Sequence, residues 1–217
     1  MNIEGVIFDL DGTLVDTIED IGDATNTLLK IHGYPQYATE DFIRWIGNGA
    51  AKFIEEAMGE EVEPVQMKNY VSEFKEIYRE NLHNKSKIYQ GVPELLDELT
   101  HRGIKLAILS NKPHHLTESV VSYYLPKWDF NPVFGQRAHV PRKPDPAGAI
   151  EIAYMMEIET ERILFVGDSV GDLKTSKTAG MVPVGVSWGY GLKQPYRVNG
   201  ETLIHHPQEL LSLIDKV

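Results

Sequence analysis

Closely spaced carboxylates are the first candidates for chemistry in this sequence. In the segment 6–16, VIFDLDGTLVD, Asp9 and Asp11 lie one residue apart directly after a run of strand-forming residues, and a Gly12-Thr13 turn follows. Two carboxylates about 4 Å apart repel each other by about 4 kcal/mol at an effective dielectric constant of about 20. A buried strand that ends in such a pair therefore indicates a function for the carboxylates and a cation that offsets their charge.

Two further aspartates follow a second apolar run, in FVGDSVGD at 165–172. Asp168 lies just past a predicted strand, and Asp172 comes four residues later at the start of a predicted helix. In an open parallel sheet, ligands bind outside the carboxyl ends of the strands. We therefore expect Asp9, Asp168 and Asp172 at one edge of the sheet. Oxygen ligands without a nearby Cys or His favour a hard cation, Mg²⁺ above all.

Neutral and basic groups follow other predicted strands. Ser110 and Asn111 come after the predicted strand 104–109, and Lys143 precedes two prolines in RKPDP at 142–146. Together with Mg²⁺ and free backbone N–H groups in the Gly12-Thr13 turn, these groups would bind a phosphoryl group. A carboxylate beside that group can attack phosphorus, as in enzymes that form aspartyl-phosphates. The paired aspartates then divide the chemistry, one as nucleophile and the other for proton transfer.

Strands and helices alternate along the parts of the chain that position these groups. Short apolar segments rich in Val and Ile predict buried parallel strands at Ile3–Phe8, Ile104–Leu109, Ile163–Val166 and Val182–Val186, with a weaker one around 132–134. Helical patterns are found at 92–103, 145–158, 171–181 and, as a final surface helix, 207–217. The alternation is typical of an α/β protein with a doubly wound, Rossmann-like parallel sheet.

The stretch between the first two predicted strands is too long for a simple crossover, which needs about a dozen residues. Its apolar residues recur with helical spacing, as in the set Ile18, Ile21, Leu28 and Ile31. We therefore predict an inserted small α-helical domain of about four helices at residues 15–87. The α/β core would then be formed by residues 1–14 and 88–217.

Four motifs occur in order along the chain: DLDGTLVDT, LSNK, KPDP and GDSVGD. They resemble the four motifs of the haloacid dehalogenase-like hydrolase superfamily, and the helical insertion resembles the type-1 cap of that superfamily. The resemblance implies that Asp9 is the nucleophile and that Asp11 is the general acid and then the general base. It also implies that Ser110 and Lys143 bind the transferring phosphoryl group, with Lys143 screening Asp9.

The same resemblance implies the remaining ligands. Mg²⁺ would be held by Asp9, by the backbone carbonyl of Asp11 and by Asp168, with Asp172 acting directly or through a water molecule. Phosphate-binding positions carried over by the motifs also include Gly12, Thr13 and Asn111. Asp172 has a second interpretation, as a negative charge favoured at a helix N-terminus.

Asp11 argues against a dehalogenase, because the dehalogenases of the superfamily lack the second aspartate. The segment FIRWIGNGAAKFI at 42–54 and the ending WGYG…HHPQELLSLI resemble phosphoglycolate phosphatases, in which a Gly-rich turn and a nearby arginine, here Arg44, face the site. We therefore expect hydrolysis of a small phosphorylated metabolite, with 2-phosphoglycolate as the named candidate. A sugar phosphomutase similar to β-phosphoglucomutase, a pyrophosphatase and a non-catalytic binding protein stay open, as does a surface role for Arg44.

The amino-acid composition limits the binding partners and the cellular location that we expect. The 217 residues contain no cysteine, which excludes disulfides and thiolate chemistry and agrees with a cytoplasmic location. No apolar run approaches the length of a membrane span. The formal net charge of −11 argues against a nucleic-acid or anionic membrane surface. The sequence is compatible with a monomer or a homodimer.

Overall fold

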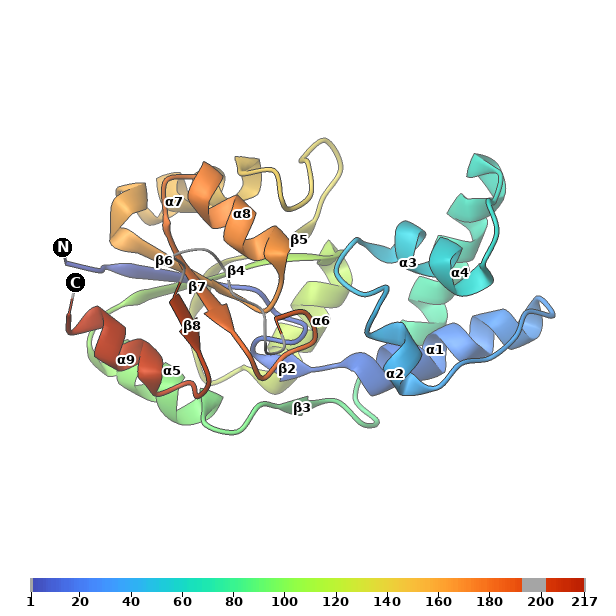
Figure 1. Ribbon diagram of the computed structural model, residues 1–217, viewed down its shortest axis with the longest axis horizontal. Coiled ribbons are helices and arrows are strands. Elements are labelled where there is room, and N and C mark those ends of the chain that lie inside the picture. Colours follow the sequence, from blue (N-terminus) through green and yellow to red (C-terminus); the bar gives the residue numbers. More distant parts are fainter. Residues whose placement is uncertain (1, 193–201, 217) are drawn as a thin grey trace.

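The structure is a computed structural model that describes residues 2–192 and 202–216 of the chain. Six parallel strands form one sheet in the order β5-β4-β1-β6-β7-β8 (Figure 1). They are β1 (Gly5–Phe8), β4 (Lys105–Pro113), β5 (Phe130–Gln136), β6 (Ile163–Gly167), β7 (Val182–Val186) and β8 (Thr202–Ile204). The prediction of a doubly wound parallel α/β sheet is confirmed.

Helices cover both faces of the sheet. In Figure 1, α7 (Ala147–Met156) and α8 (Val170–Thr178) lie on one side, and α5 (Val92–His101) and α9 (Glu209–Ile214) lie on the other. The strand side chains alternate accordingly: Ile7 packs with Ile152 of α7, whereas Val6 and Phe8 belong to the cluster that includes Leu96 of α5. This alternation explains why the strands read as apolar on both faces.

One helix that packs on the sheet and one strand of the sheet were not predicted from the sequence. The helix α6 (His114–Tyr124) follows β4 directly and buries Leu116 and Val120 in the same cluster as α5. The edge strand β8 has three residues and pairs with β7. The final helix is shorter than the predicted segment 207–217, whose last residue, Val217, lies outside the described residues.

Four helices lie between β1 and α5, within residues that are all described. They are α1 (Ile18–Ile31), α2 (Thr39–Phe42), α3 (Ala50–Met58) and α4 (Pro64–Asn81). Ile18, Ile21 and Leu28 of α1 are buried as predicted, whereas Ile31, the last residue of that helix, is 58% exposed. Figure 1 shows these helices grouped beyond one end of the sheet.

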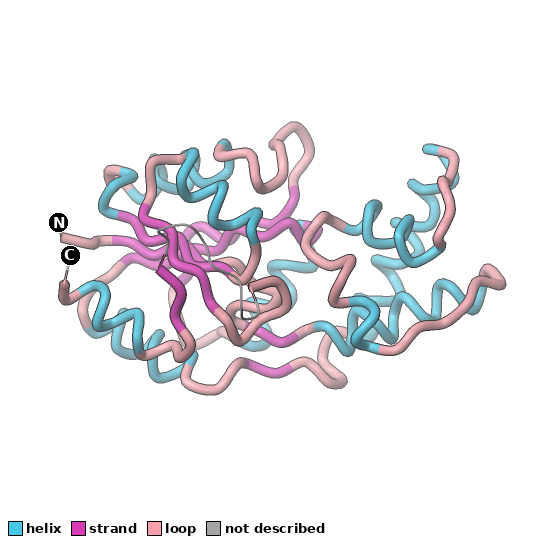
Figure 2. Tube along the Cα trace, in the orientation of Figure 1, coloured by secondary structure: helices cyan, strands magenta, loops and turns pink. Residues whose placement is uncertain are grey.

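A two-stranded ribbon joins these helices to the sheet. The strand β2 (Val15–Asp16) leads into α1, β3 (Lys87–Ile88) follows α4, and the two strands pair antiparallel. Figure 2 shows both short strands below the main sheet, on the path toward the helices. The outgoing and returning segments therefore lie side by side. Among the described helices, none has the length and hydropathy that crossing a membrane requires.

Candidate active site

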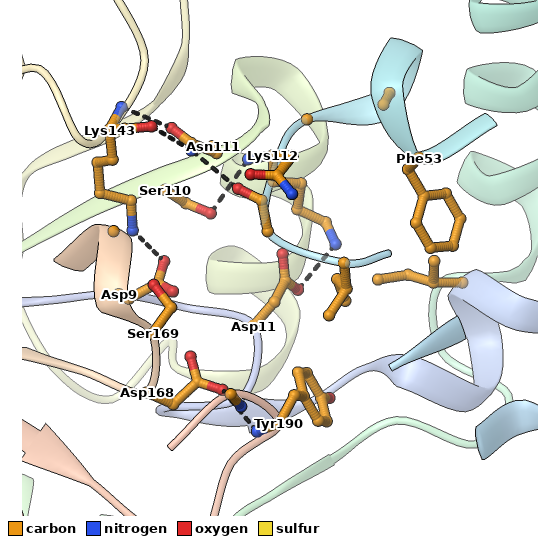
Figure 3. Close-up of a pocket in the computed structure, with 18 of the residues that line it drawn as sticks. Asp9, Asp11, Phe53, Ser110, Asn111, Lys112, Lys143, Asp168, Ser169 and Tyr190 are labelled. Carbon is orange, nitrogen blue, oxygen red and sulfur yellow. Dashed lines mark hydrogen bonds and ion pairs between the residues drawn. The ribbon is translucent and has the colours of Figure 1, made fainter. Parts of the chain in front are cut away.

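The carboxyl ends of the three central strands bring the predicted residues together. Asp9 follows β1 directly, and β1 lies between β4 and β6, with Phe8 opposite Ile108 and Val166. Ser110 and Asn111 belong to the last part of β4, and Asp168 follows β6. Parallel strands end at the same edge of a sheet, so side chains distant in sequence meet there (Figure 3).

Lys143 provides the positive charge at this edge. Its Nζ atom lies 2.8 Å from Oδ1 of Asp9 and 2.6 Å from Oδ1 of Asp172, and its side chain is 5% exposed. Burial disfavours the charge of this ammonium, but Asp172 and Asp9 outweigh burial and raise the pKa of Lys143 above its ordinary value. Lys143 is therefore a permanent cation between two carboxylates.

Three buried carboxylates lie close together here, and two of them contact the Lys143 ammonium. Asp9, Asp168 and Asp172 each offer an oxygen, and these oxygens lie within 4.8 Å of one another. Burial, together with the charges of Asp172 and Asp168, raises the pKa of Asp9 to about 8, although Lys143 opposes the shift. Burial and Asp172 likewise raise the pKa of Asp168 to about 7. When ionised, the three carboxylates carry more negative charge than one ammonium offsets, and a divalent cation fits this donor set.

Asp172 lies at the start of α8, as the sequence predicts, and both of its carboxylate oxygens have partners. Ser169 and Asp172 form a capping box at the start of α8, in which Oδ2 of Asp172 accepts hydrogen bonds from the Ser169 backbone N–H at 3.0 Å and from the Ser169 hydroxyl at 2.5 Å. The other oxygen, Oδ1, accepts from Lys143. Asp172 thus caps the helix and also fixes Lys143 beside Asp9.

Asp168 is oriented by a loop that carries Tyr190. Oδ2 of Asp168 accepts hydrogen bonds from the backbone N–H of Tyr190 at 2.6 Å and of Gly191 at 3.3 Å. The Tyr190 hydroxyl in turn accepts from the N–H groups of Thr17, at 2.7 Å, and Ile18 and donates to Asp16. One tyrosine therefore connects the acidic cluster with the first turn of α1.

Asp11 faces the inserted helices rather than Lys143. Its Oδ1 atom accepts hydrogen bonds from the Thr17 hydroxyl at 2.6 Å and from Nζ of Lys112 at 2.9 Å. Lys112 also donates to the hydroxyl of Tyr78, on α4, at 2.8 Å. The two aspartates of the DLD segment thus have different partners, Lys143 for Asp9 and Lys112 for Asp11.

Ser110 and Asn111 differ in what they present to the site. Ser110 is 4% exposed, lines the cavity and accepts a hydrogen bond from the Lys112 backbone N–H at 3.2 Å. The Asn111 side chain instead binds backbone groups: Oδ1 accepts from the Lys143 N–H, and Nδ2 donates to the carbonyls of Lys143 and Gly47. Asn111 therefore holds the loop that carries Lys143 and contacts the turn between α2 and α3.

The Gly12-Thr13 turn does not offer the free N–H groups that the sequence predicts. The Gly12 N–H donates to the Val15 carbonyl at 2.9 Å and the Thr13 N–H to the Leu10 carbonyl at 3.3 Å, so this part of the prediction is wrong. Thr13 is fully buried, and its hydroxyl has no hydrogen-bond partner among the described residues. Gly12 has a φ of 87°, and a side chain there would collide with Asp168 and Tyr190. The turn therefore packs against the acidic cluster.

Arg44 lies outside the cavity. Its side chain is 71% exposed and pairs with Asp41, three residues earlier in the chain. The neighbouring Gly-rich turn does reach the site, because residues 47–50 line the cavity and the Asn48 carbonyl accepts a hydrogen bond from Arg142 at 2.7 Å. The turn therefore contacts the core through its backbone carbonyls, and Arg44 lies on the surface.

A cavity of about 290 Å³ joins the sheet edge to the inserted helices. Its core side carries Asp9, Asp11, Ser110, Lys143 and Asp168 (Figure 3). Its opposite side is largely apolar and is formed by Ile21, Ile43, Ile46, Phe53 and Phe74. A phosphoryl group of a small ligand would match the charged core side of this cavity.

Three residues of the site are absent from the sequence-based prediction. Lys112 follows Asn111 directly in the LSNK motif, so the motif could have indicated that Lys112 lies at the site. Tyr190 lies in the WGYG segment, but its contact with Asp168 spans 22 positions. Tyr78 belongs to the apolar face of α4, where an aromatic residue ordinarily indicates a core position.

Comparison with known proteins identifies the family. The family model described as haloacid dehalogenase-like hydrolase matches residues 6–186. The chain belongs to this family. It is 32% identical to a phosphoglycolate phosphatase of Haemophilus influenzae, over 95% of this chain and 96% of that protein. It is also 32% identical to phosphoglycolate phosphatase 1 of Pseudomonas aeruginosa, over 97% of this chain and 79% of that protein.

A solved structure of the family supports the same assignment. The crystal structure of a predicted phosphoglycolate phosphatase from Haemophilus somnus 129pt superposes with a TM-score of 0.89 at 28% identity, covering 98% of each chain. The resemblance of the four motifs to this hydrolase family is therefore confirmed, and the fold is shared over 98% of the chain.

Proposed function

We propose that this chain is a Mg²⁺-dependent phosphomonoesterase that acts through an aspartyl-phosphate intermediate on a small phosphorylated metabolite. The observation that carries the proposal is the buried Asp9 carboxylate, which lies 2.8 Å from the Lys143 ammonium at the floor of a cavity. A nucleophile next to a fixed cation can attack a phosphoryl group whose negative charge the same cation stabilises.

The proposed reaction has two steps. In the first, a carboxylate oxygen of Asp9 forms a bond to phosphorus while the bond to the ester oxygen breaks, and Asp11 gives that oxygen a proton. In the second, Asp11 takes a proton from a water molecule that attacks phosphorus, the bond to Asp9 breaks, and inorganic phosphate leaves. Lys143 and Ser110 hold the phosphoryl oxygens in both steps.

The acidic cluster is the proposed Mg²⁺ site. Asp9, Asp168 and the backbone carbonyl of Asp11 would hold the ion, with Asp172 close by. When bound, the ion supplies charge compensation for the carboxylates and for the phosphoryl oxygens. Because both oxygens of Asp172 already have partners, we assign this residue to positioning Lys143 and to the surroundings of the ion.

The proposed substrate is 2-phosphoglycolate. Relatives from Haemophilus influenzae and Pseudomonas aeruginosa that align along almost all of this chain are named phosphoglycolate phosphatases. The small cavity supports a short leaving group. We further propose that residues 15–87 act as a cap domain over a core of residues 1–14 and 88–217, so that closure excludes water during the first step. A cytoplasmic location and a monomeric or homodimeric state stay predictions.

Phosphate release is the measurement that tests this function. The wild-type chain should release inorganic phosphate from 2-phosphoglycolate and p-nitrophenyl phosphate with Mg²⁺ and lose the activity in EDTA. Asp9→Asn should lower kcat by about 10³-fold or more. Acid quenching should trap phosphate on the peptide that contains Asp9. Equal rates for wild type and Asp9→Asn would disprove the mechanism.

The same assays separate the alternatives. A sugar phosphomutase would move phosphate between two positions of one sugar with little release of inorganic phosphate, and a pyrophosphatase would prefer pyrophosphate. A binding protein without chemistry would bind Mg²⁺ and turn over no phosphoester.

A further inference from the structure

The cavity contains a second lysine besides Lys143, and this lysine, Lys112, lies next to the proposed proton donor Asp11. Among the described residues that line the cavity, the cationic ones are Lys143 and Lys112. Lys143 lies beside Asp9, where the phosphoryl group is proposed to bind, whereas Lys112 lies beside Asp11, the proposed proton donor to the leaving oxygen. Figure 3 shows Lys112 on the side of Asp11 that is turned toward Phe53 and the inserted helices.

Lys112 has donor capacity that the protein does not use. Its side chain is 4% exposed, and its ammonium donates to Asp11 at 2.9 Å and to Tyr78 at 2.8 Å. An ammonium carries three N–H donors, so one stays without a partner among the described residues. A buried donor of this kind gains most from an acceptor that arrives with the ligand.

Tyr78 contributes a second donor next to the first. Its hydroxyl oxygen accepts from Lys112, which leaves the phenolic proton for another acceptor, and the described residues provide none. Burial raises the pKa of Tyr78 well above its ordinary value, so the phenol keeps that proton. An ammonium N–H and a phenolic O–H therefore adjoin each other on the wall of the cavity.

We propose that Lys112 and Tyr78 bind a carboxylate of the leaving group and so make the site selective for small phosphorylated hydroxy acids; this inference rests on the proposed phosphatase function. In 2-phosphoglycolate the carboxylate is separated from the ester oxygen by one methylene group. Lys112 contacts Asp11, the proposed proton donor to that oxygen, so a carboxylate at this spacing falls next to Lys112. A charged acceptor with two donors forms strong hydrogen bonds.

The apolar part of the wall supports the same selectivity. Ile43, Ile46, Phe53 and Phe74 offer no hydrogen-bonding side chain to the hydroxyl groups of a sugar. Hydroxyl groups buried there without partners would lose their hydration, which disfavours larger sugar phosphates.

Two esters that differ in one group test the inference. The ratio of kcat/KM for 2-phosphoglycolate to kcat/KM for 2-hydroxyethyl phosphate, measured with Mg²⁺, isolates the contribution of the carboxylate. Wild type should favour 2-phosphoglycolate. Lys112→Met should lower this ratio by about 10- to 100-fold, which is about 1.4 to 2.8 kcal/mol, and Tyr78→Phe by about 3- to 10-fold.

Thr17→Val is the matched control. Thr17 donates to the same Asp11 oxygen as Lys112 but does not line the cavity, so its loss should slow both esters equally and keep the ratio. If Lys112→Met fails to fold, Tyr78→Phe decides, because it removes a single hydroxyl. Equal slowing of both esters in both variants would overturn the carboxylate site while the phosphatase stands. A wild type that hydrolyses neither ester would overturn the proposed function and this inference with it.

Discussion

The side chain of Asn111 forms two hydrogen bonds with the backbone of Lys143, from the Lys143 N–H to Oδ1 at 3.0 Å and from Nδ2 to the Lys143 carbonyl at 3.0 Å. This pair joins the end of β4 to the loop that follows β5. The ammonium of Lys143 can reach Asp9 because its backbone is held at this point.

Asn111→Ala should therefore impair catalysis without removing a catalytic group. Small displacements of a positioned cation cost about 10²-fold in rate, so we expect kcat/KM for p-nitrophenyl phosphate to fall by about 10- to 100-fold. Asn84→Ala, which removes an exposed asparagine of the inserted region, is the control and should leave the rate unchanged. A wild-type rate in Asn111→Ala would show that Lys143 keeps its place without the clamp.

Lys143→Met should destabilise the metal-free protein. The substitution leaves Asp9 and Asp172 buried without their counter-charge, and breaking a buried ion pair costs about 3 to 5 kcal/mol. Urea unfolding in EDTA measures the loss, and Mg²⁺ should restore part of it. Lys127→Met removes an exposed lysine paired with Asp97 and should change the free energy of unfolding by about 0.5 kcal/mol or less. Similar losses in the two variants would contradict the assignment.

The metal-free protein should lose stability as the pH rises from about 4 to about 8. Burial raises the pKa of Asp168 to about 7 and that of Asp9 to about 8, above their ordinary value of 3.8. A carboxyl group whose pKa is higher in the folded state favours folding while it is protonated, so its contribution is complete below the unfolded pKa and is lost progressively up to the folded pKa. Thermal unfolding in EDTA from pH 5 to 9 measures this decline.

Mg²⁺ should reverse that pH dependence. The ion binds ionised carboxylates and displaces their protons, so its stabilising effect should grow with pH. Asp168→Asn lacks one of the titrating groups and should show a shallower decline in EDTA. A melting temperature in EDTA that rises between pH 6 and 9 would contradict the assigned shifts.

Tyr190→Phe should separate stability from metal binding. The variant loses the hydroxyl that accepts from Thr17 and Ile18 and donates to Asp16, which should cost about 1 to 3 kcal/mol in unfolding free energy. It keeps the backbone N–H that binds Asp168, so Mg²⁺ affinity should stay near the wild-type value. Tyr154→Phe, at a site 84% exposed, is the control for stability. A large loss of Mg²⁺ affinity would show that the hydroxyl also orients the acidic cluster.

The sheet and the gathering of Asp9, Ser110, Lys143 and Asp168 could be predicted from the sequence. Both follow from local patterns and one geometric rule: buried strands read as runs of Val and Ile, and parallel strands end at one edge. The edge strand β8 could not be predicted because it has three residues, too few to show the hydrophobic pattern of a strand.

Contacts that depend on packing could not be predicted in this way. The N–H groups of Gly12 and Thr13 are used within their own turn, which the motif letters do not reveal. Tyr190 meets Asp168 through the fold of a distant loop. The surface position of Arg44 did have a signal, because Asp41 lies three residues earlier and opposite charges at this spacing pair along a helical turn.

The antiparallel pairing of Val15–Asp16 with Lys87–Ile88 has a consequence for how such a chain diversifies. The inserted segment leaves and re-enters the core at two adjacent strands. It can therefore be replaced, lengthened or shortened while the register of the sheet and the position of Asp9 stay unchanged. Changes in the inserted segment can then alter the space for the leaving group, while Lys112 stays on β4 of the core.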